Sequence, residues 1–257
     1  MAHVIDYYYV SSIGKCRKVN QDNFYCNGVF LSCDNQGTGQ VLEGRAKTKN
    51  APVFGVFDGM GGEECGEMAA YLAAKEMHGF SFEKGMEQAF FDFCTDANHQ
   101  ICKYTEENGI SSMGTTAAIL RLTAENSCLC NIGDSKIFLF SQGALTQISY
   151  DHVGIGVFGR KPPLSQNLGI PETEMIIEPY VAMGSYQPGD VYLICSDGLT
   201  DMVTQLQIQQ ILTENPEREA AEQLLEAALR NGGKDNITFI LMYVKKQKRK
   251  LFGLFER

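Results

Sequence analysis

Eight stretches of the chain are mainly apolar or alternate between apolar and polar positions, and these patterns predict β-strands. They cover residues 7–10, 23–33, 53–57, 115–122, 127–132, 136–140, 191–195 and 237–244. Turn-forming sequences rich in glycine, asparagine and proline lie between several of them.

Helical periodicity is confined to two other blocks of the chain. The first block predicts two helices, with apolar faces made of Cys65, Ala69, Leu72 and Ala73 in one and Met86, Phe90, Phe93 and Ala97 in the other. The second block begins near Leu206, and its last helix has Asn215 as predicted N-cap, Pro216 in the first turn and Gly232 after its end. The predicted buried stripe of that helix is Ala220, Ala221, Leu224, Leu225 and Ala228. Because strands come in runs and helices in pairs, we predict an α+β fold with antiparallel sheets and helices packed outside them.

The composition is that of one globular domain with a short basic end. The 257 residues are 44% hydrophobic and 21% charged, and no linker or repeat divides the first 240 or so. We therefore predict one domain over residues 1–244 and a basic C-terminal tail over residues 245–257.

Several classes of protein are disfavoured by the same composition. A net charge of −9 argues against a general nucleic-acid binder. No apolar run reaches the roughly 20 residues of a membrane-spanning helix, and the N-terminus has no secretory signal. Nine cysteines without a CxxC pair indicate reduced thiols in a cytoplasmic protein, and four isolated histidines offer little for a zinc site.

Five aspartates stand beside predicted buried strands, mostly next to a glycine. They are Asp22, Asp58, Asp134, Asp197 and Asp235. Any one of them alone would indicate an ordinary turn, but five repetitions suggest strand ends that converge. Carboxylates that lie so near to one another raise each other's pKa, and a bound cation relieves the repulsion between their charges. Oxygen ligands without histidine or cysteine favour Mg²⁺ or Mn²⁺.

Arg17 lies a few residues before the first of these aspartates. Its guanidinium is a planar donor fork suited to a phosphoryl group. A surface ion pair is the alternative reading of this residue.

The same residues fall in six short motifs that follow one another between about residues 10 and 244. They are Arg17 with Asn20-Gln21-Asp22, Phe57-Asp58-Gly59-Met60-Gly61-Gly62, Met113-Gly114-Thr115-Thr116, Ile132-Gly133-Asp134-Ser135, Cys195-Ser196-Asp197-Gly198-Leu199 and Gly233-Lys234-Asp235-Asn236-Ile237-Thr238. This ordered set resembles the metal-dependent type 2C protein serine/threonine phosphatases (the PPM family) in their bacterial form. The resemblance implies a four-layer α-β-β-α sandwich, in which two central antiparallel sheets are flanked by helix pairs.

The resemblance also implies two Mg²⁺ or Mn²⁺ ions. Asp58 would bridge them, the Gly59 carbonyl would bind one ion, and Asp197 and Asp235 would bind the other. Water bridging the ions would be deprotonated near neutral pH and would attack phosphorus in line.

Three further residues have implied roles beside the two ions. Asp22 would hold metal-bound water, Asp134 with Asp197 would form a third, weaker metal site, and Arg17 would grip the substrate phosphate. The implied activity is hydrolysis of phosphoserine and phosphothreonine in proteins, with Arg17 and Asp58 as the catalytic residues.

The chain departs from the family pattern at three positions. Gln21 stands where the family usually has glutamate, Met60 where many members have histidine, and Lys136 where arginine is commoner. Gln21 predicts weaker binding of the second metal, and Met60 leaves the general acid unassigned. A non-catalytic pseudophosphatase that binds a phosphoprotein is the alternative, with Gln21 as its only support.

Two segments carry open predictions. Residues 152–170 correspond to the flap beside the site in this family, and a mobile lid and a plain surface loop are equally compatible with them. For the basic tail a solvated segment is favoured over contact with an anionic membrane surface or an acidic partner. The expected partners are phosphorylated proteins, opposing a serine/threonine kinase, and the expected state is a cytoplasmic monomer.

Overall fold

The computed structural model describes residues 2–60, 65–82, 85–156 and 161–247 and contains two antiparallel sheets. The first sheet has the strand order β3-β1-β12-β11-β8-β9, and the second has the order β10-β7-β6-β4-β2, with β5 paired to β4. The strands are β1 (His3–Ser12), β2 (Asp22–Cys26), β3 (Leu42–Lys47), β4 (Val53–Met60), β5 (Gly114–Thr115), β6 (Ala117–Leu122), β7 (Ser127–Ile132), β8 (Lys136–Ser141), β9 (Ala144–Gln147), β10 (Tyr180–Gly184), β11 (Val191–Cys195) and β12 (Ile237–Lys246).

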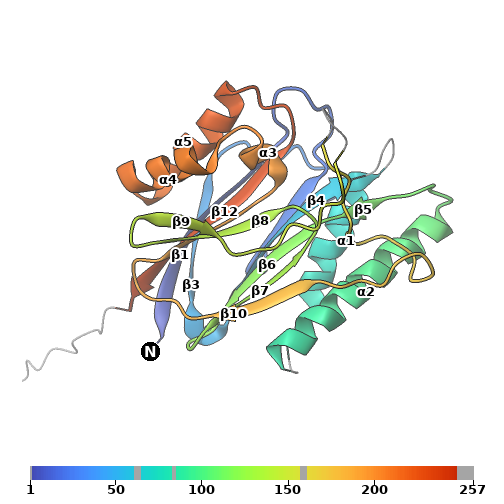
Figure 1. Cartoon of the computed structure of the whole chain (residues 1–257), viewed down its shortest axis with the longest axis horizontal. Coiled ribbons are helices and arrows are strands. Elements are labelled where there is room, and N and C mark those ends of the chain that lie inside the picture. The colour runs from blue at the N-terminus through green and yellow to red at the C-terminus, as the bar shows by residue number, and fades with distance from the viewer. Residues whose placement is uncertain (1, 61–64, 83–84, 157–160, 248–257) are drawn as a thin grey trace, which may run out of the picture.

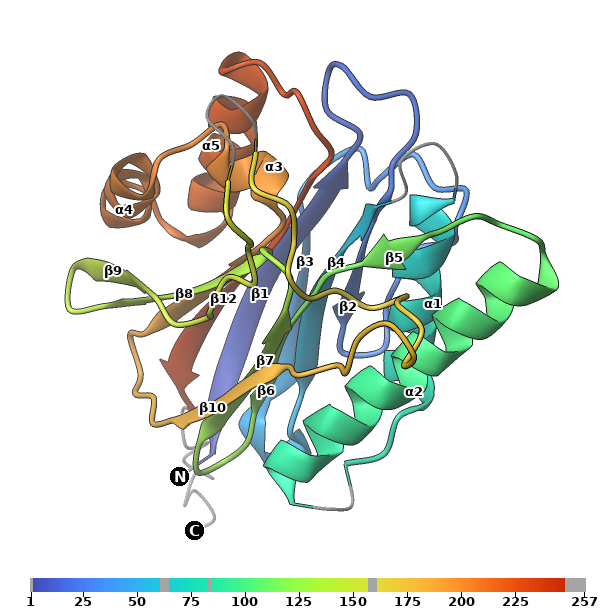
Figure 2. The same cartoon turned by 45° about the vertical axis from the view of Figure 1, so that its right-hand side comes forward.

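Two groups of helices cover the outer faces of the sheets, as Figures 1 and 2 show. On one side lie α1 (Gly66–Gly79) and α2 (Met86–Glu107). On the other lie α3 (Asp197–Thr200), α4 (Gln205–Glu214) and α5 (Glu217–Arg230). A short 3₁₀ turn, η1 (Thr48–Asn50), precedes β4. The arrangement confirms the predicted α+β fold with helix pairs outside two central sheets.

The hydrophobic core has three layers that lie between these four layers of structure. One cluster packs the first sheet against α3, α4 and α5, a second fills the space between the sheets, and a third packs the second sheet against α1 and α2. Strand β1 shows how the sequence builds two layers at once. Tyr8 and Val10 point into the outer cluster, whereas Tyr7 and Tyr9 point between the sheets, as the two-residue period of a strand requires.

Three strands were not predicted from the sequence, and all three lie at sheet edges. Strands β3 and β9 are the edges of the first sheet, and β10 is an edge of the second. Most of their side chains are partly buried or exposed, so they lack the apolar runs that mark central strands. The predicted strand at 23–33 is shorter than expected, because Asn27 and Gly28 turn the chain with positive φ after β2.

The predicted N-cap of the last helix is wrong. Helix α5 has Pro216 as its N-cap, and Asn215 instead ends α4, where its side-chain amide donates to the Ile211 carbonyl at 3.0 Å. The two helices follow each other so closely that Asn215 caps the end of the first one.

The C-terminal strand continues beyond the predicted domain end. Strand β12 runs to Lys246, so the first two basic residues of the predicted tail belong to the first sheet. Residues 248–257 of the predicted tail lie outside the described residues. Among the helices of the described residues, none combines the length and the apolar character needed to cross a membrane.

Candidate metal centre

The end of β4 carries Asp58 and Gly59, and its backbone is held by hydrogen bonds from the neighbouring segment. The Asp58 amide donates to Thr116 Oγ1 at 3.1 Å, and the Asp58 carbonyl accepts from the Thr116 amide at 2.9 Å and from Thr115 Oγ1 at 3.0 Å. A Cβ at Gly59 would come within 2.1 Å of the Gly66 carbonyl oxygen, so only glycine fits. Asp58 is therefore presented from a fixed strand end.

Asp22 pairs with Asp58 across β2 and β4 and is only 2% exposed. The hydroxyl of Ser196 donates to Asp22 Oδ2 at 2.8 Å. Burial raises the pKa of Asp22 to about 7, against the lowering effect of hydrogen bonds from Ser196 and Thr238, and the charge of Asp235 adds to the rise.

Asp134 and Asp197 come from the turns that follow β7 and β11. Gly133, with a φ of +96°, makes the turn that places Asp134, and Asp197 opens the short helix α3. A Cβ at Gly198 would lie 1.9 Å from the Asn236 carbonyl oxygen, so the Asp-Gly pair lets α3 approach the start of β12 closely.

Asn236 fastens the N-terminal loop to the start of β12. Its Nδ2 donates to two carbonyls of the segment 13–19 at 3.1 and 3.0 Å, and its Oδ1 accepts from the Gln21 amide at 2.8 Å. The loop so held carries Arg17, whose Nη2 lies 2.6 Å from Asp235 Oδ2. Asn236 thus holds the first motif, which contains Arg17, beside the last motif, which contains Asp235.

These segments enclose a cavity of about 400 Å³, which we call the metal-centre cavity. Its lining residues are Arg17, Gln21, Asp58, Gly59, Met60, Thr116, Asp134, Lys161, Pro162, Leu164, Asp197, Asp201 and Asp235. Of the seven residues predicted for the site, the structure brings six to this cavity. The seventh, Asp22, is buried beside Asp58 and does not line it.

The protein neutralises the carboxylates of the cavity only in part, because five aspartates line it with two basic side chains. Burial raises the pKa of Asp58 well above its usual range, and the charges of Asp22, Asp134 and Asp235 add to the rise. Crowded, buried carboxylates of this kind become favourable only when cations bind them.

The donor set fits a hard divalent cation, because carboxylate and carbonyl oxygens surround the cavity without histidine or cysteine. Within the described ranges, no three acidic, histidine or cysteine side chains converge tightly enough to form a ready-made site for one ion. Basic side chains are bound to the acidic groups instead, since Arg17 holds Asp235 and Lys161 holds Asp134 and Asp197.

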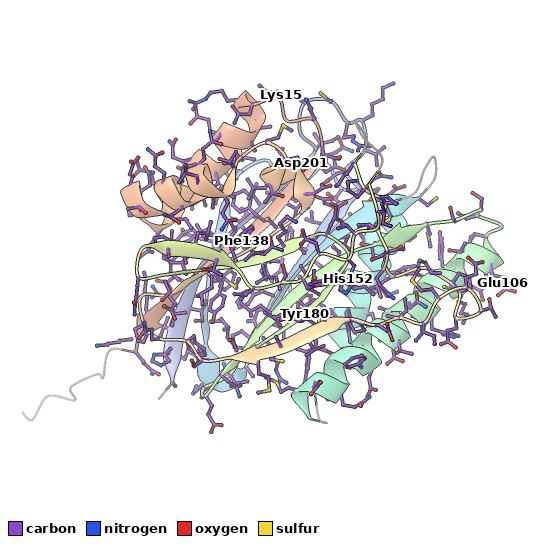
Figure 3. The ribbon with its side chains drawn as sticks, viewed as in Figure 1. Lys15, Glu106, Phe138, His152, Tyr180 and Asp201 are labelled. Atoms are coloured by element: carbon purple, nitrogen blue, oxygen red, sulfur yellow. The ribbon has the colours of Figure 1, made fainter. Side chains whose placement is uncertain are left out.

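Sequence reasoning missed two charged residues of the cavity, Lys161 and Asp201. Burial alone would lower the pKa of Lys161, but Asp134, Asp201 and Asp58 raise it overall, so the ammonium stays charged. Lys161 lies in a glycine- and proline-rich loop, where no periodic pattern marks a site residue. Asp201 follows α3 and is labelled in Figure 3; its closeness to Asp197 in sequence was the available signal.

A larger cavity, of about 810 Å³, lies between α2 and residues 169–175. It is lined by none of the seven predicted site residues. In Figure 3 Glu106, on its wall, and Asp201, at the metal-centre cavity, lie in different parts of the molecule. The larger cavity therefore does not coincide with the predicted site.

Comparison with known proteins gives a consistent result. The family model described as protein phosphatase 2C matches residues 43–232. The chain is 28% identical to serine/threonine phosphatase stp of Listeria monocytogenes serotype 4b (strain F2365) over 249 residues, which are 89% of this chain and 92% of that protein. It is 34% identical to serine/threonine protein phosphatase PstP of Mycobacterium tuberculosis (strain ATCC 25618 / H37Rv) over 206 residues, which are 74% of this chain and 40% of that protein.

A solved structure shares the fold. It is the catalytic domain of serine threonine protein phosphatase PstP in complex with two manganese ions, which matches with a TM-score of 0.74 and 28% identity. The match covers 95% of this chain and all of that one.

Proposed function

The chain belongs to the protein phosphatase 2C family, and on this basis we propose that it is a protein serine/threonine phosphatase that works with Mg²⁺ or Mn²⁺. One observation carries the proposal. Five aspartates from four segments line one cavity together with only two basic side chains, Arg17 and Lys161, so their charges are compensated only in part.

In this proposal two ions bind between the strand ends. Asp58 and the Gly59 carbonyl would hold one ion, and Asp58, Asp197 and Asp235 would hold the other. When bound, such ions supply an activated water and neutralise charge on the phosphoryl oxygens. Asp22 supports Asp58 from the buried side, where its own hydrogen bond from Ser196 fixes its orientation.

Arg17 would bind the phosphoryl group of the substrate. Its side chain is half exposed and sits at the cavity, so a phosphate entering from solvent meets the guanidinium. The ion pair with Asp235 holds the guanidinium in place. Arg17 would exchange Asp235 for the phosphate when substrate enters or when Asp235 binds a metal ion.

Met60 and Gln21 are the positions where this cavity differs from the family pattern, and both line it. Met60 has no proton to give, so we propose that the leaving oxygen takes its proton from solvent. Gln21 donates from Nε2 to Glu67 Oε2 at 3.5 Å, so a carboxylate stands beside the neutral amide at this end of the cavity.

The expected substrates are phosphorylated serine and threonine side chains of proteins, in opposition to a serine/threonine kinase. We also propose a cytoplasmic location, a monomeric state and no role for nucleic acid. The pseudophosphatase alternative is not retained, because the aspartates needed for metal binding are all present at or beside the cavity.

Hydrolysis of a phosphothreonine peptide with Mn²⁺, with and without chelator, tests the proposal. We expect turnover that the chelator abolishes and that added Mn²⁺ restores. Turnover that survives the chelator, or no turnover with any divalent metal, would contradict it.

A further inference from the structure

Lys161 reaches into the metal-centre cavity and binds two of its carboxylates at once. Its Nζ lies 3.0 Å from Asp134 Oδ2 and is also in contact with Asp197 Oδ2. These two aspartates are nearly buried, with exposed side-chain fractions of 9% and 14%, whereas Lys161 is half exposed. A single ammonium group thus bridges the carboxylates proposed for the third, weaker metal ion.

The backbone that carries Lys161 is held by a short ladder of hydrogen bonds. The Gly154 amide donates to the Pro163 carbonyl at 2.8 Å, and the Ser165 amide donates to the His152 carbonyl at 2.9 Å. Pro162 alone separates Lys161 from Pro163, the first ladder residue, and the two prolines restrict the backbone there. The lysine therefore acts as a tethered cation with a high local concentration at Asp134 and Asp197.

An ammonium at Asp134 Oδ2 and Asp197 Oδ2 competes with a divalent ion that needs the same two carboxylates. Both need the oxygens of Asp134 and Asp197, and two cations a few ångströms apart repel each other in a partly buried site. The ion proposed at Asp58 and Gly59 does not meet this competition, and the ion proposed at Asp197 and Asp235 can use Asp197 Oδ1, because Lys161 contacts Oδ2.

We propose that Lys161 is the built-in third cation of this metal centre and competes with a third divalent ion for Asp134 and Asp197. This role rests on the proposed function, since it assumes that two ions bind at Asp58. In addition, the position of a third ion is occupied by the ammonium group of Lys161. It follows that a third ion enters only by displacing the lysine from the cavity.

Equilibrium dialysis with Mn²⁺, followed by metal analysis, tests the proposal on the full chain. We expect two Mn²⁺ ions to bind wild type tightly and a third weakly. In Lys161→Gln the third ion should bind about tenfold more tightly, because the variant removes the competing charge. Lys161→Arg, which keeps the charge, should retain weak third-site binding.

Two controls make the result specific. Lys103→Gln removes an ammonium of α2 that pairs with Glu107 and does not line the cavity, so its third-site affinity should match wild type. In an Asp134→Asn background the effect of Lys161→Gln should disappear, because the third ion loses a ligand. Circular dichroism establishes that each variant is folded.

The outcomes separate the two proposals. If wild type binds two ions and the third-site affinity of Lys161→Gln is unchanged or weaker, the lysine is not a competitor and this inference is wrong. If wild type binds no Mn²⁺, the metal-dependent function itself fails.

Discussion

Two cavities of nearly equal volume are lined by charged residues, yet their charges are balanced differently. The metal-centre cavity, of about 400 Å³, has five aspartates and two basic side chains in its lining. The second, of about 430 Å³, which we call the ion-pair cavity, is lined by Asp6, Tyr8, Glu43, Gly44, Arg45, Glu217 and Lys245.

Every acidic group of the ion-pair cavity has a basic partner. Asp6 binds both Arg45 and Lys245, and Lys245 also binds Glu217. Glu43 pairs with Arg218 of α5 at 3.0 Å. This network joins β1, β3, β12 and α5, and it needs no added ion.

The pKa shifts in the two cavities run in opposite directions. A hydrogen bond from Arg45 lowers the pKa of Asp6 despite burial, and Lys245 adds to the effect. Burial and neighbouring carboxylates instead raise the pKa of Asp58 and Asp22. Balanced charge stabilises the fold, whereas unbalanced charge creates a site that gains stability only when cations bind.

The largest expected effect of a substitution is at the centre of the unbalanced site. Asp58→Asn should lower kcat/KM for a phosphothreonine peptide by about 1,000-fold or more, because the ligand proposed to bridge both ions is lost. The matched variant Asp6→Asn in the ion-pair cavity should leave kcat/KM within about threefold of wild type. Equal losses in both variants would remove the functional distinction between the cavities.

Arg17→Ala should have the next largest effect, a loss in kcat/KM of roughly 100-fold, because a charge-assisted contact to the phosphoryl group disappears. Arg45→Ala, which removes an aspartate-paired arginine from the other cavity, serves as control. Steady-state kinetics on the same peptide would measure both. An Arg17→Ala enzyme with wild-type kinetics would show that Arg17 is only a surface ion pair.

In the balanced cavity the expected effect is on stability. Asp6→Asn should lower the free energy of unfolding by about 1–3 kcal/mol, because Arg45 and Lys245 lose a nearly buried partner. Since the pKa of Asp6 is lowered in the folded state, its contribution is present above the unfolded pKa, and it is lost as pH falls through the folded pKa. Urea unfolding should therefore show a larger difference in stability between wild type and variant at pH 7 than at pH 3.

The smallest expected effect is the pH dependence of metal stabilisation. The pKa of Asp22 rises from 3.8 to about 7 on folding, so the folded state binds more protons than the unfolded state between these values. Without metal, stability should therefore fall as pH increases from about 4 to about 7. Mn²⁺ should raise Tm by roughly 2–5 °C more at pH 7.5 than at pH 5.5, because its ligands must be deprotonated. A Tm increase that is independent of pH would contradict this account.

Much of the fold could be predicted from the sequence, because the central strands are buried on both faces. The runs at 127–132 and 191–195 coincide with β7 and β11. Edge strands were missed for a physical reason. In β3 exposed residues alternate with partly buried or buried ones, and a glycine and three charged side chains occupy four of the six positions, so no apolar run distinguishes it from a loop.

The candidate site could be predicted as far as its residues lie in short motifs at strand ends. Asn236, which ties the N-terminal loop to β12, was visible only as part of such a motif. Lys161 could not be predicted, because its role depends on a contact with Asp134 and Asp197 across the fold. The local pattern of apolar and polar residues reflects which side chains are buried. The contacts of a single loop residue depend on the tertiary structure.

Anomalous diffraction from crystals grown with Mn²⁺ tests the central claim most directly. We predict two strong peaks in the metal-centre cavity, both within bonding distance of Asp58, with Asp197 and Asp235 bound to one of them. The ion-pair cavity should contain no peak. Peaks confined to other places, or a metal-centre cavity without manganese, would contradict the account.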